Sequence, residues 1–373
     1  MSVRICENAS QWDNAVKTLG GTLFQSWQWG EYRRIQKWRP WRILIEVQNR
    51  VCGAMQIFER RTPLVPFSVM LSPGGVAGSN DIACLKELAS WLRSFLKERR
   101  GLLVRLEPEF AEDDEASKDL LTSVGFRSLP RVWLPLSEVP RTVMVLDLNR
   151  PEAEIFQGMR RNHRSHIQHA LKGDVEFVAG RDPAQLEDLH RLLLNTSGRK
   201  NFAPPSLENL HHLRRTVLSE YDGAIWLARY QGKTVAGVLV AAFGNSCHCL
   251  WAGSDWSFRD LQVNEAVQWK AMQWAKHLGY RDYDLGGHCR DGVPEQDDEC
   301  YGIYNYKKKF GAELRLRASY FDLPGPRLAY ELYRFAEVRG RRAAVILLRE
   351  TRRLKQAIIS TRRTSEAPSG ASG

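Results

Sequence analysis

Two stretches of the chain alternate apolar and polar residues with the period of a β-strand, and a short polar turn interrupts each stretch. The paired runs are 43–47 with 51–55 and 224–230 with 235–239. Two β-rich runs around a short polar or glycine-containing turn are typical of a β-hairpin. Each second run carries a Val-x-Gly sequence at the same place, ending at Gly53 and at Gly237. The pattern therefore predicts two related hairpins, one in each half of the chain.

The segments that follow the two hairpins also correspond. Each half continues with an amphipathic helix that a glycine ends, a short apolar strand, and a further helix beside a Gly/Phe pair. The predicted helices and strands are 82–100, 102–106 and 118–124 in the first half, and 264–278, 283–285 and 302–309 in the second. Apolar residues at helical spacing support the helices. A repeated β-β-α-β-α order predicts a mixed α/β (α+β) protein with two tandem domains.

The domain limits follow from the same pattern. We place the first domain at 1–150 and the second at 151–326, because a predicted strand at 142–148 gives way to a helix at 152–171. The remainder, 327–373, is predicted to be a C-terminal basic helix followed by a disordered tail, with packing on the first domain as one option.

Charge is concentrated near the C-terminus. The 373 residues include 54 Lys+Arg and 43 Asp+Glu, a net charge of +11. Residues 334–363 contribute +8 of this, so the rest of the chain is close to neutral. A basic, partly apolar helix suits an anionic membrane or tRNA, whereas a solvated tail without a partner is the alternative.

Other features bear on location. The first residues lack the basic and apolar stretches of a signal peptide, and no run approaches the ~20 apolar residues that span a bilayer. Seven scattered cysteines suggest reduced thiols. We therefore expect a cytoplasmic protein without a transmembrane segment. A further option is that it binds peripherally to the inner face of the plasma membrane.

The β-β-α-β-α unit is the kernel of the GNAT acyltransferase fold, in which acetyl-CoA binds a glycine-containing loop at the start of the central helix. The corresponding segment, 256–265, has no glycine and carries Asp260 and Glu265 where a pyrophosphate would lie. An acyl-CoA donor is therefore disfavoured by these residues.

Five motifs in order give the chain a resemblance to a known family. They are Phe24-Gln25-Ser26-Trp27-Gln28-Trp29-Gly30, Met159-Arg160-Arg161-Asn162-His163-Arg164, Trp251-Ala252-Gly253-Ser254, Tyr283-Asp284-Leu285-Gly286-Gly287, and the segment 302–311, Gly-Ile-Tyr-Asn-Tyr-Lys-Lys-Lys-Phe-Gly. Together they resemble the Fem-type aminoacyltransferases (FemA, FemB, FemX). Members of that family have two GNAT-like domains and transfer amino acids from aminoacyl-tRNA to peptidoglycan precursors. The long coiled-coil arm of some members is not expected here, because no heptad run is present.

The resemblance implies roles for individual residues. Lys307 corresponds to the family's active-site lysine, which suits stabilisation of charge on a reacting ester, although a solvated helix face would explain it as well. Arg33 matches a substrate-phosphate position, with a surface ion pair as the alternative. The resemblance also suggests substrate binding by Arg199, Lys200 and Trp251, and a general-base role for Glu107.

The expected function is amide-bond formation on a free amine of a nucleotide- or lipid-linked envelope precursor, from aminoacyl-tRNA. One alternative is an acyl-CoA-dependent N-acyltransferase acting on an envelope polysaccharide or sugar nucleotide. A second is a non-catalytic membrane- or RNA-binding protein. We expect no cofactor and no metal, because His163, His166 and His169 drift around a helix instead of lying at i, i+4 spacing.

Overall fold

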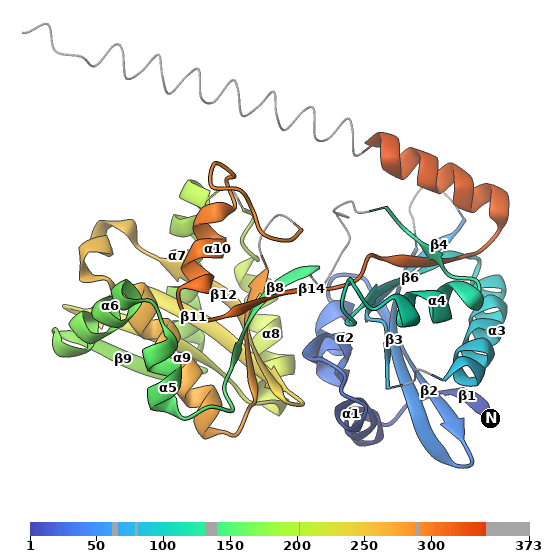
Figure 1. Cartoon of the computed structure of the whole chain (residues 1–373), viewed down its shortest axis with the longest axis horizontal. Helices are drawn as coiled ribbons and strands as arrows, with labels where there is room; N and C mark the ends of the chain where they lie inside the picture. Colours follow the sequence, from blue (N-terminus) through green and yellow to red (C-terminus); the bar gives the residue numbers. More distant parts are fainter. Residues whose placement is uncertain (62–65, 79–80, 131–139, 201, 288–290, 341–373) are drawn as a thin grey trace, which may run out of the picture. The chain divides into compact units, whose positions relative to one another are not determined.

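The computed structural model describes residues 1–61, 66–78, 81–130, 140–200, 202–287 and 291–340 (Figure 1). The chain divides into two compact units, Met1–Leu323 and Pro324–Gly373. The first unit holds both sheets and all the residues discussed below as a functional site.

The first sheet has eight strands in the order β1-β2-β3-β4-β6-β15-β7, and β5 pairs with β3. Its strands are β1 (Ser2–Ile5), β2 (Arg39–Val47), β3 (Arg50–Arg61), β4 (Ser68–Gly74), β5 (Val76–Ala77), β6 (Gly101–Pro108), β7 (Arg127–Ser128) and β15 (Phe321–Pro324). The helices of this half are α1 (Ala9–Thr18), η1 (Leu23–Gln25), α2 (Trp27–Arg34), α3 (Ile82–Arg99) and α4 (Glu115–Ser123).

The second sheet has seven strands in the order β14-β8-β13-β12-β11-β10-β9. Its strands are β8 (Thr142–Asp147), β9 (Val175–Gly180), β10 (Gly223–Tyr230), β11 (Lys233–Phe243), β12 (Ser246–Ser254), β13 (Asp282–Gly287) and β14 (Glu313–Leu316). The helices are α5 (Glu152–Gly158), α6 (Arg161–Lys172), α7 (Pro183–Lys200), α8 (Leu207–Glu220), η2 (Trp256–Leu261), α9 (Val263–His277) and α10 (Tyr301–Lys308).

The predicted repeat is present at the level of hydrogen-bonded strands. In each sheet a hairpin leads to a third antiparallel strand, which then pairs in parallel with the strand that follows the central helix. These strands are β2-β3-β4 and β6 around α3, and β10-β11-β12 and β13 around α9. The mixed α/β class with tandem GNAT-like units is confirmed.

The two Val-x-Gly sequences have the same structural cause. Gly53 lies opposite Ile45 in the first hairpin, and Gly237 lies opposite Leu227 in the second. A Cβ at either glycine would approach the δ-carbon of that neighbour to 2.8 Å and 2.6 Å, respectively. Each glycine therefore leaves room for a large aliphatic side chain on the neighbouring strand.

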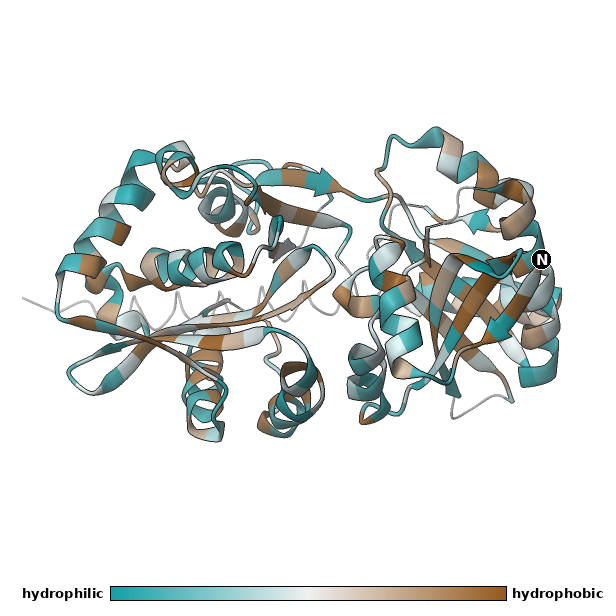
Figure 2. Ribbon diagram, turned by 90° about the horizontal axis from the view of Figure 1, so that it is seen from below, coloured by the Kyte–Doolittle hydropathy of each residue, from teal (hydrophilic) through white to brown (hydrophobic). Residues whose placement is uncertain are grey.

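Apolar side chains of the helices and sheets form a separate core in each half. Buried residues of α3 pack with those of β2, β3, β4 and β6, whereas α5, α6 and α9 share a core with one face of the second sheet. Helices cover both faces of the second sheet, and hydrophobic segments of the ribbon face inward between them (Figure 2). This packing fixes the strand ends on which the site is built.

The predicted helix 152–171 is wrong as a single helix. The chain forms α5 and α6, with Met159 and Arg160 in extended conformation between them. Arg160 N donates to the carbonyl of Lys309 at 2.9 Å, and Met159 is 2% exposed. At the break, a contact with a distant part of the chain thus takes the place of a hydrogen bond within the helix. The apolar periodicity of the sequence does not reveal such a contact.

Two strands pair with the sheet of the other half, not with the sheet of the sequence segment in which they lie. β8 precedes the proposed limit at 150 but pairs with β13 and β14 of the second sheet. β15 precedes the limit at 326 but pairs with β7 of the first sheet. The limits 1–150, 151–326 and 327–373 therefore remain a proposal about sequence segments, and the chain crosses between sheets on both sides of the second segment.

Residues 327–340 are helical, in agreement with the predicted C-terminal helix as far as the described residues extend. Most of the basic segment lies beyond them. None of the described helices is long and apolar enough to cross a membrane. Cys6, Cys52, Cys84, Cys247 and Cys249 are free thiols, as predicted. Cys300 is disulfide-bonded, so the prediction of seven reduced cysteines is wrong there.

Candidate functional site

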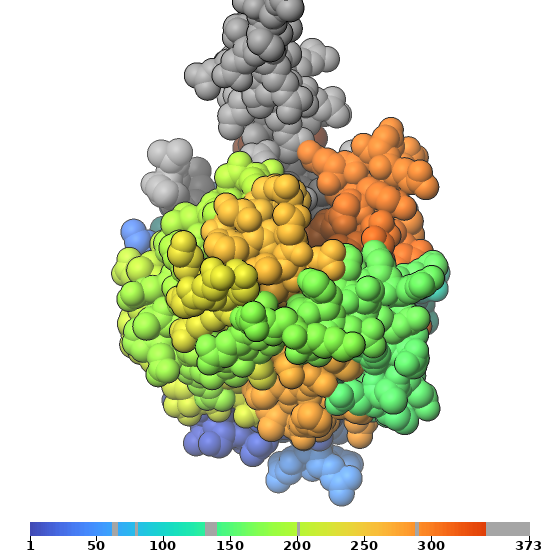
Figure 3. All heavy atoms as spheres, turned by 90° about the vertical axis from the view of Figure 1, so that its left-hand side faces the viewer, coloured from blue at the N-terminus to red at the C-terminus, as the bar shows by residue number. Residues whose placement is uncertain are grey.

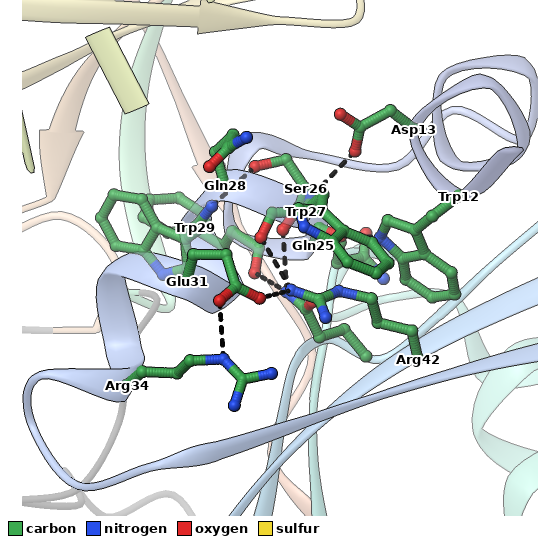
Figure 4. Close-up of polar contacts among 12 residues, drawn as sticks. Trp12, Asp13, Gln25, Ser26, Trp27, Gln28, Trp29, Glu31, Arg34 and Arg42 are labelled. Atoms are coloured by element: carbon green, nitrogen blue, oxygen red, sulfur yellow. Dashed lines mark hydrogen bonds and ion pairs between the residues drawn. The ribbon is translucent and has the colours of Figure 1, made fainter. Parts of the chain in front are cut away.

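The Phe-Gln-Ser-Trp-Gln-Trp-Gly motif builds the start of α2. The hydroxyl oxygen of Ser26 accepts a hydrogen bond from Trp29 N at 3.2 Å and caps the helix. The backbone N–H of Trp27 donates to Asp13 Oδ1 at 2.8 Å, and Gln25 Nε2 donates to the carbonyl of Gly75 at 3.1 Å. Figure 4 shows these side chains converging on the first turn of α2. The motif is thus structural and fixes the helix that carries Arg33.

Arg42 completes this support from β2. Its Nη2 donates to the carbonyl of Trp27 at 2.9 Å and to Glu31 Oε1 at 2.8 Å, and its guanidinium lies 3.5 Å from the centre of the Trp27 ring (Figure 4). Burial lowers the pKa of Arg42, against the hydrogen bond and charge of Glu31. Gly30 is required beside it, since a Cβ there would lie 2.5 Å from Arg42 Nη2.

A cavity of about 420 Å³ lies against α2, the middle of β12 and the end of β13. Its lining includes aromatic side chains, a proline-containing loop and glycines: Phe24, Trp29, Tyr32, Trp251, Ala203, Pro204, Pro205, Gly286 and Gly287. Arg33 contributes a cation to this lining and is 8% exposed. Its guanidinium contacts Gln36 Oε1 and lies 5.6 Å from the ring of Trp38. Arg33 is therefore a buried side chain, not a solvated group on the surface.

A bulge in β12 shapes the cavity wall. Leu239 and Val240 of β11 pair with Trp251 and Cys249, so Leu250 is an extra residue in β12. As a result His248, Cys249, Leu250 and Trp251 all line the cavity, which four successive residues of a regular strand cannot do. Trp251, a predicted substrate-binding residue, thus follows the bulge directly and lines the same cavity as Arg33.

The two parallel strands β12 and β13 separate next to this bulge. They pair from Ser246 with Asp282 to His248 with Asp284, and no further. The corresponding strands of the first sheet, β4 and β6, stay paired to Gly74 and Pro108. Only the second sheet thus offers an opening between its parallel strands among the described residues.

Lys307 reaches this opening from α10. Its Nζ donates to the carbonyl of Gly287 at 2.6 Å, and the side chain is 7% exposed. A Cβ at Gly286, which has φ +77°, would lie 3.6 Å from that Nζ. Burial lowers the pKa of Lys307 to about 8, although Cys249 and Asp284 favour the charged form. The other reading, a solvated helix face, is excluded for Lys307.

His248 and Asp284 form a pair in the same wall that the sequence motifs did not single out. His248 Nδ1 lies 3.4 Å from Asp284 Oδ2, and Asp284 Oδ1 accepts a hydrogen bond from Gly286 N at 2.7 Å. Burial raises the pKa of Asp284, but the hydrogen bond and charge of His248 outweigh this and hold the pKa below its usual value. The only sequence signal was the position of Asp284 inside the Tyr-Asp-Leu-Gly-Gly motif.

The other predicted site residues lie elsewhere. Glu107 is 2% exposed within β6, opposite Pro73, and is not among the residues of the described cavities. Arg199 is exposed near the end of α7, where its Nη2 donates to the carbonyl of Ser254 at 3.2 Å and its guanidinium lies 4.8 Å from the Trp256 ring. Lys200 ends α7 and its side chain lies outside the described atoms. The structure therefore places Arg33 and Trp251 in the lining of one cavity, with Lys307 hydrogen-bonded to Gly287 of the same lining, and the roles of all three stay predictions.

A second cavity, of about 790 Å³, shares His248 and Asp284 with the first. Six carboxylates and three basic side chains line it: Glu109, Glu112, Asp113, Glu115, Asp282 and Asp284 with Lys118, Arg315 and Arg317. A surplus of carboxylates disfavours a phosphate and favours a cationic group.

Comparisons with known proteins agree with this geometry. Residues 157–308 match the family described as an acetyltransferase (GNAT) domain. The chain is 21% identical to a Lipid II:glycine glycyltransferase of Staphylococcus haemolyticus, over 88% of this chain and 94% of the relative. It is 22% identical to the same-named protein of Staphylococcus epidermidis, over 92% and 97%. The crystal structure of FemX superimposes with a TM-score of 0.82 at 19% identity, over 89% of this chain and 99% of FemX.

The match to a GNAT acetyltransferase domain, together with the glycyltransferase relatives, makes the protein an acyltransferase. The second, non-catalytic alternative is therefore set aside. The chain is thus similar to the glycyltransferases over nearly their full length and has the fold of FemX, in agreement with the predicted resemblance to the Fem-type aminoacyltransferases.

Proposed function

We propose that this protein transfers an aminoacyl group from aminoacyl-tRNA to a free amine of a lipid-linked cell-envelope precursor. The observation that carries the proposal is that Arg33 and Trp251 line one cavity together with Gly287, whose carbonyl accepts the hydrogen bond of the buried Lys307. The names of the relatives, Lipid II:glycine glycyltransferase, support both the envelope acceptor and a glycyl group.

The acceptor fits the smaller cavity. Arg33 supplies a fixed cation for a phosphate oxygen, and its guanidinium is already ordered by Gln36 and Trp38. Trp251, Tyr32 and Trp29 supply apolar surface for the uncharged part of the molecule. A phosphate-linked precursor therefore meets both a charged and an apolar wall.

The chemistry needs little besides positioning and charge stabilisation. The acceptor amine attacks the ester carbonyl and a C–N bond forms. The C–O bond to the tRNA ribose then breaks, and the leaving ribose oxygen takes up the proton that the amine loses to become a hydroxyl. The Lys307 ammonium, held at the split of β12 and β13, stabilises the oxyanion of the tetrahedral intermediate. His248, oriented by Asp284, is placed to accept the proton that the attacking amine loses.

The donor distinguishes this proposal from an acyl-CoA reaction. In the GNAT fold a pyrophosphate lies at the N-terminus of the central helix, which is α9 here. Glu265 occupies the first turn of α9 and is 9% exposed. The segment 256–265 that leads into α9 also has no glycine to let the backbone approach a pyrophosphate closely, so the donor is expected to bind elsewhere. The carboxylate-rich larger cavity suits the ammonium group of an aminoacyl ester.

The experiment supplies the purified protein with radiolabelled glycyl-tRNA or acetyl-CoA, and with a lipid-linked or a nucleotide-linked peptidoglycan precursor. Label is expected in the lipid-linked product from glycyl-tRNA. Transfer only from acetyl-CoA would overturn the donor. Transfer only to the nucleotide-linked precursor would overturn the acceptor and leave the donor standing.

The basic segment 334–363 is proposed to hold the protein at an anionic membrane, where a lipid-linked acceptor resides. In the described part of the helix, Leu328, Leu332, Phe335 and Val338 are exposed at helical spacing, which gives an apolar stripe beside the basic residues. Deletion of 340–373 should abolish sedimentation with anionic vesicles. Unchanged sedimentation, or loss of tRNA binding alone, would contradict this role.

A further inference from the structure

Two histidines of one helix and a glutamate of another form a compact group where α6 packs on α9. His163 and His166 lie on α6, and Glu265 lies in the first turn of α9. One ligand atom of each residue lies within 4.8 Å of the other two. Spacing along the sequence did not suggest this group, because the third member is supplied by another helix.

The break before α6 brings the group together. The chain leaves α5 at Gly158 and restarts the helix at Arg161, with Arg160 N anchored on the carbonyl of Lys309. An i, i+3 pair on a helix lies on one face, and this face of α6 packs on α9. In Figure 3 the green segment of 150–175 lies directly beside the gold segment that leads into α9.

The hydrogen bonding of His163 fixes the state of its ring. His163 Nε2 lies 3.0 Å from the carbonyl of Tyr306, which can only accept, so Nε2 carries the proton. In a ring protonated on Nε2 alone, Nδ1 carries the lone pair. The lone pair of Nδ1 therefore points away from Tyr306, on a side chain that is 2% exposed.

Nothing in the described part of the chain satisfies that lone pair. His163 Nδ1 has no hydrogen-bond partner among the described residues, and the nearest charged atom, Glu265 Oε1, lies 3.9 Å away. A neutral imidazole lone pair and a carboxylate oxygen are both acceptors, so their approach is unfavourable unless a positive charge lies between them.

His166 offers a third possible ligand atom, on the solvent-accessible side of the group. Its Nδ1 lies 3.2 Å from Glu265 Oε1 but makes no hydrogen bond within the described residues. The side chain of His166 is 29% exposed and that of Glu265 is 11% exposed. Solvent can thus reach the group from the side of His166, which leaves a path for an ion and a place for a water ligand.

We propose that His163, His166 and Glu265 bind a divalent transition-metal ion, with Zn²⁺ as the preferred occupant. Two imidazole nitrogens and one carboxylate oxygen form a donor set that zinc accepts, with water as the fourth ligand. The Tyr306 carbonyl serves as the outer hydrogen-bond partner that orients the His163 ring toward the ion.

The position of the site suggests what the ion does. Tyr306 precedes Lys307 on α10, and its hydroxyl donates to the carbonyl of Asn264, next to Glu265, at 3.3 Å. Bound metal would hold α6 and α9 together and, through His163 and Tyr306, fix the turn of α10 that carries Lys307. The role is structural, because the three ligands are not among the residues of the two cavities described above.

The test measures metal content and affinity of the full chain. Protein stripped with a chelator is titrated with Zn²⁺ and, separately, with Co²⁺, whose visible spectrum reports low coordination number. Retention of one zinc ion per chain and a rise in the unfolding temperature are expected. His166→Ala and Glu265→Gln should weaken zinc binding at least ~10-fold. His169→Ala is the matched control, since this exposed histidine lies on the same helix outside the group.

Circular dichroism confirms that each variant is folded before titration, and Glu265→Gln preserves side-chain shape. Absence of stoichiometric zinc and cobalt binding by the wild-type chain would overturn the proposal and leave a histidine–glutamate ion pair. Equal affinity in wild type, His166→Ala and Glu265→Gln would overturn it too, because metal would then bind elsewhere. Neither outcome depends on transferase activity.

Discussion

Lys307 Nζ donates a 2.6 Å hydrogen bond to the carbonyl of Gly287, the last residue of β13. This bond holds a nearly buried cation at the point where β12 and β13 part. A carbonyl that neutralises only part of the charge leaves the ammonium able to attract a developing oxyanion. The hydrogen bond between Lys307 and Gly287 keeps the ammonium in this opening. The first three predictions concern this lysine.

Replacement of Lys307 tests its role in the reaction. Lys307→Met should lower kcat about 100- to 1,000-fold with little change in KM, the usual effect of losing one oxyanion-stabilising group. Steady-state transfer assays measure this. Lys308→Met is the control, because Lys308 is exposed on the same helix and should retain activity. Equal activity of the Lys307→Met and Lys308→Met variants would remove Lys307 from the mechanism.

The pH profile of activity reports the protonation of Lys307. Its pKa of about 8 implies that the cation is present below this pH and lost above it. The kcat is therefore expected to fall as the pH rises through about 8. In Lys307→Arg the guanidinium stays charged, so the remaining activity should not fall in this range. A wild-type profile that stays flat up to pH 10 contradicts the assignment.

Folding stability should change with pH through the same group. The pKa of Lys307 falls from 10.5 in the unfolded chain to about 8 in the folded one. Between these values the unfolded state binds more protons, so the stability of the wild type rises with pH relative to Lys307→Met. The total is about 3 kcal/mol, at 1.36 kcal/mol per pH unit. Urea unfolding of both proteins at pH 7 and pH 10 measures the difference, and a constant difference would disprove it.

Arg33 is expected to act on the acceptor. Arg33→Ala should raise the KM for a phosphate-linked acceptor about 10-fold or more, since a charge-assisted contact contributes about 1.5–3 kcal/mol. The neighbouring Arg34 provides the control, because its side chain is 52% exposed and pairs with Glu31 at 2.6 Å. Competition with inorganic pyrophosphate separates the two variants further. A KM shift shared by Arg33→Ala and Arg34→Ala would indicate damage to α2.

A buried ion pair joins the returning strand β15 to the first sheet. Arg105 Nε and Nη2 donate to Asp322 Oδ1 and Oδ2 at 2.7 and 2.8 Å, and the two side chains are 1% and 0% exposed. Asp322→Asn leaves the arginine charge buried and should lower the free energy of unfolding by about 3–5 kcal/mol. Glu46→Gln, which breaks the part-exposed pair with Arg4, should cost less than about 1 kcal/mol. Chemical denaturation compares them.

Hydrophobic periodicity was sufficient for the repeated elements. The hairpins, α3, α9, and the parallel strands β6 and β13 lie within a few residues of their predicted limits, because burial of one face imposes a period on each of them. Lys307 and Arg33 could be named from short motifs. The single helix expected at 152–171 failed because the contacts that interrupt it come from Lys309, far along the chain.

Residue patterns along the chain were sufficient to predict the tandem α/β architecture, the resemblance to the Fem-type family, and the residue types of the site. Only the folded chain shows which of those residues come together. Arg33 and Trp251 line one cavity, and Lys307 bonds to Gly287 of its wall. Glu107 stays inside β6, Arg199 is exposed on α7, and Glu265 joins His163 and His166. The physical reason is that periodicity records only whether a side chain is buried. Its neighbours depend on strand register, on the bulge at Leu250, and on where β12 and β13 separate.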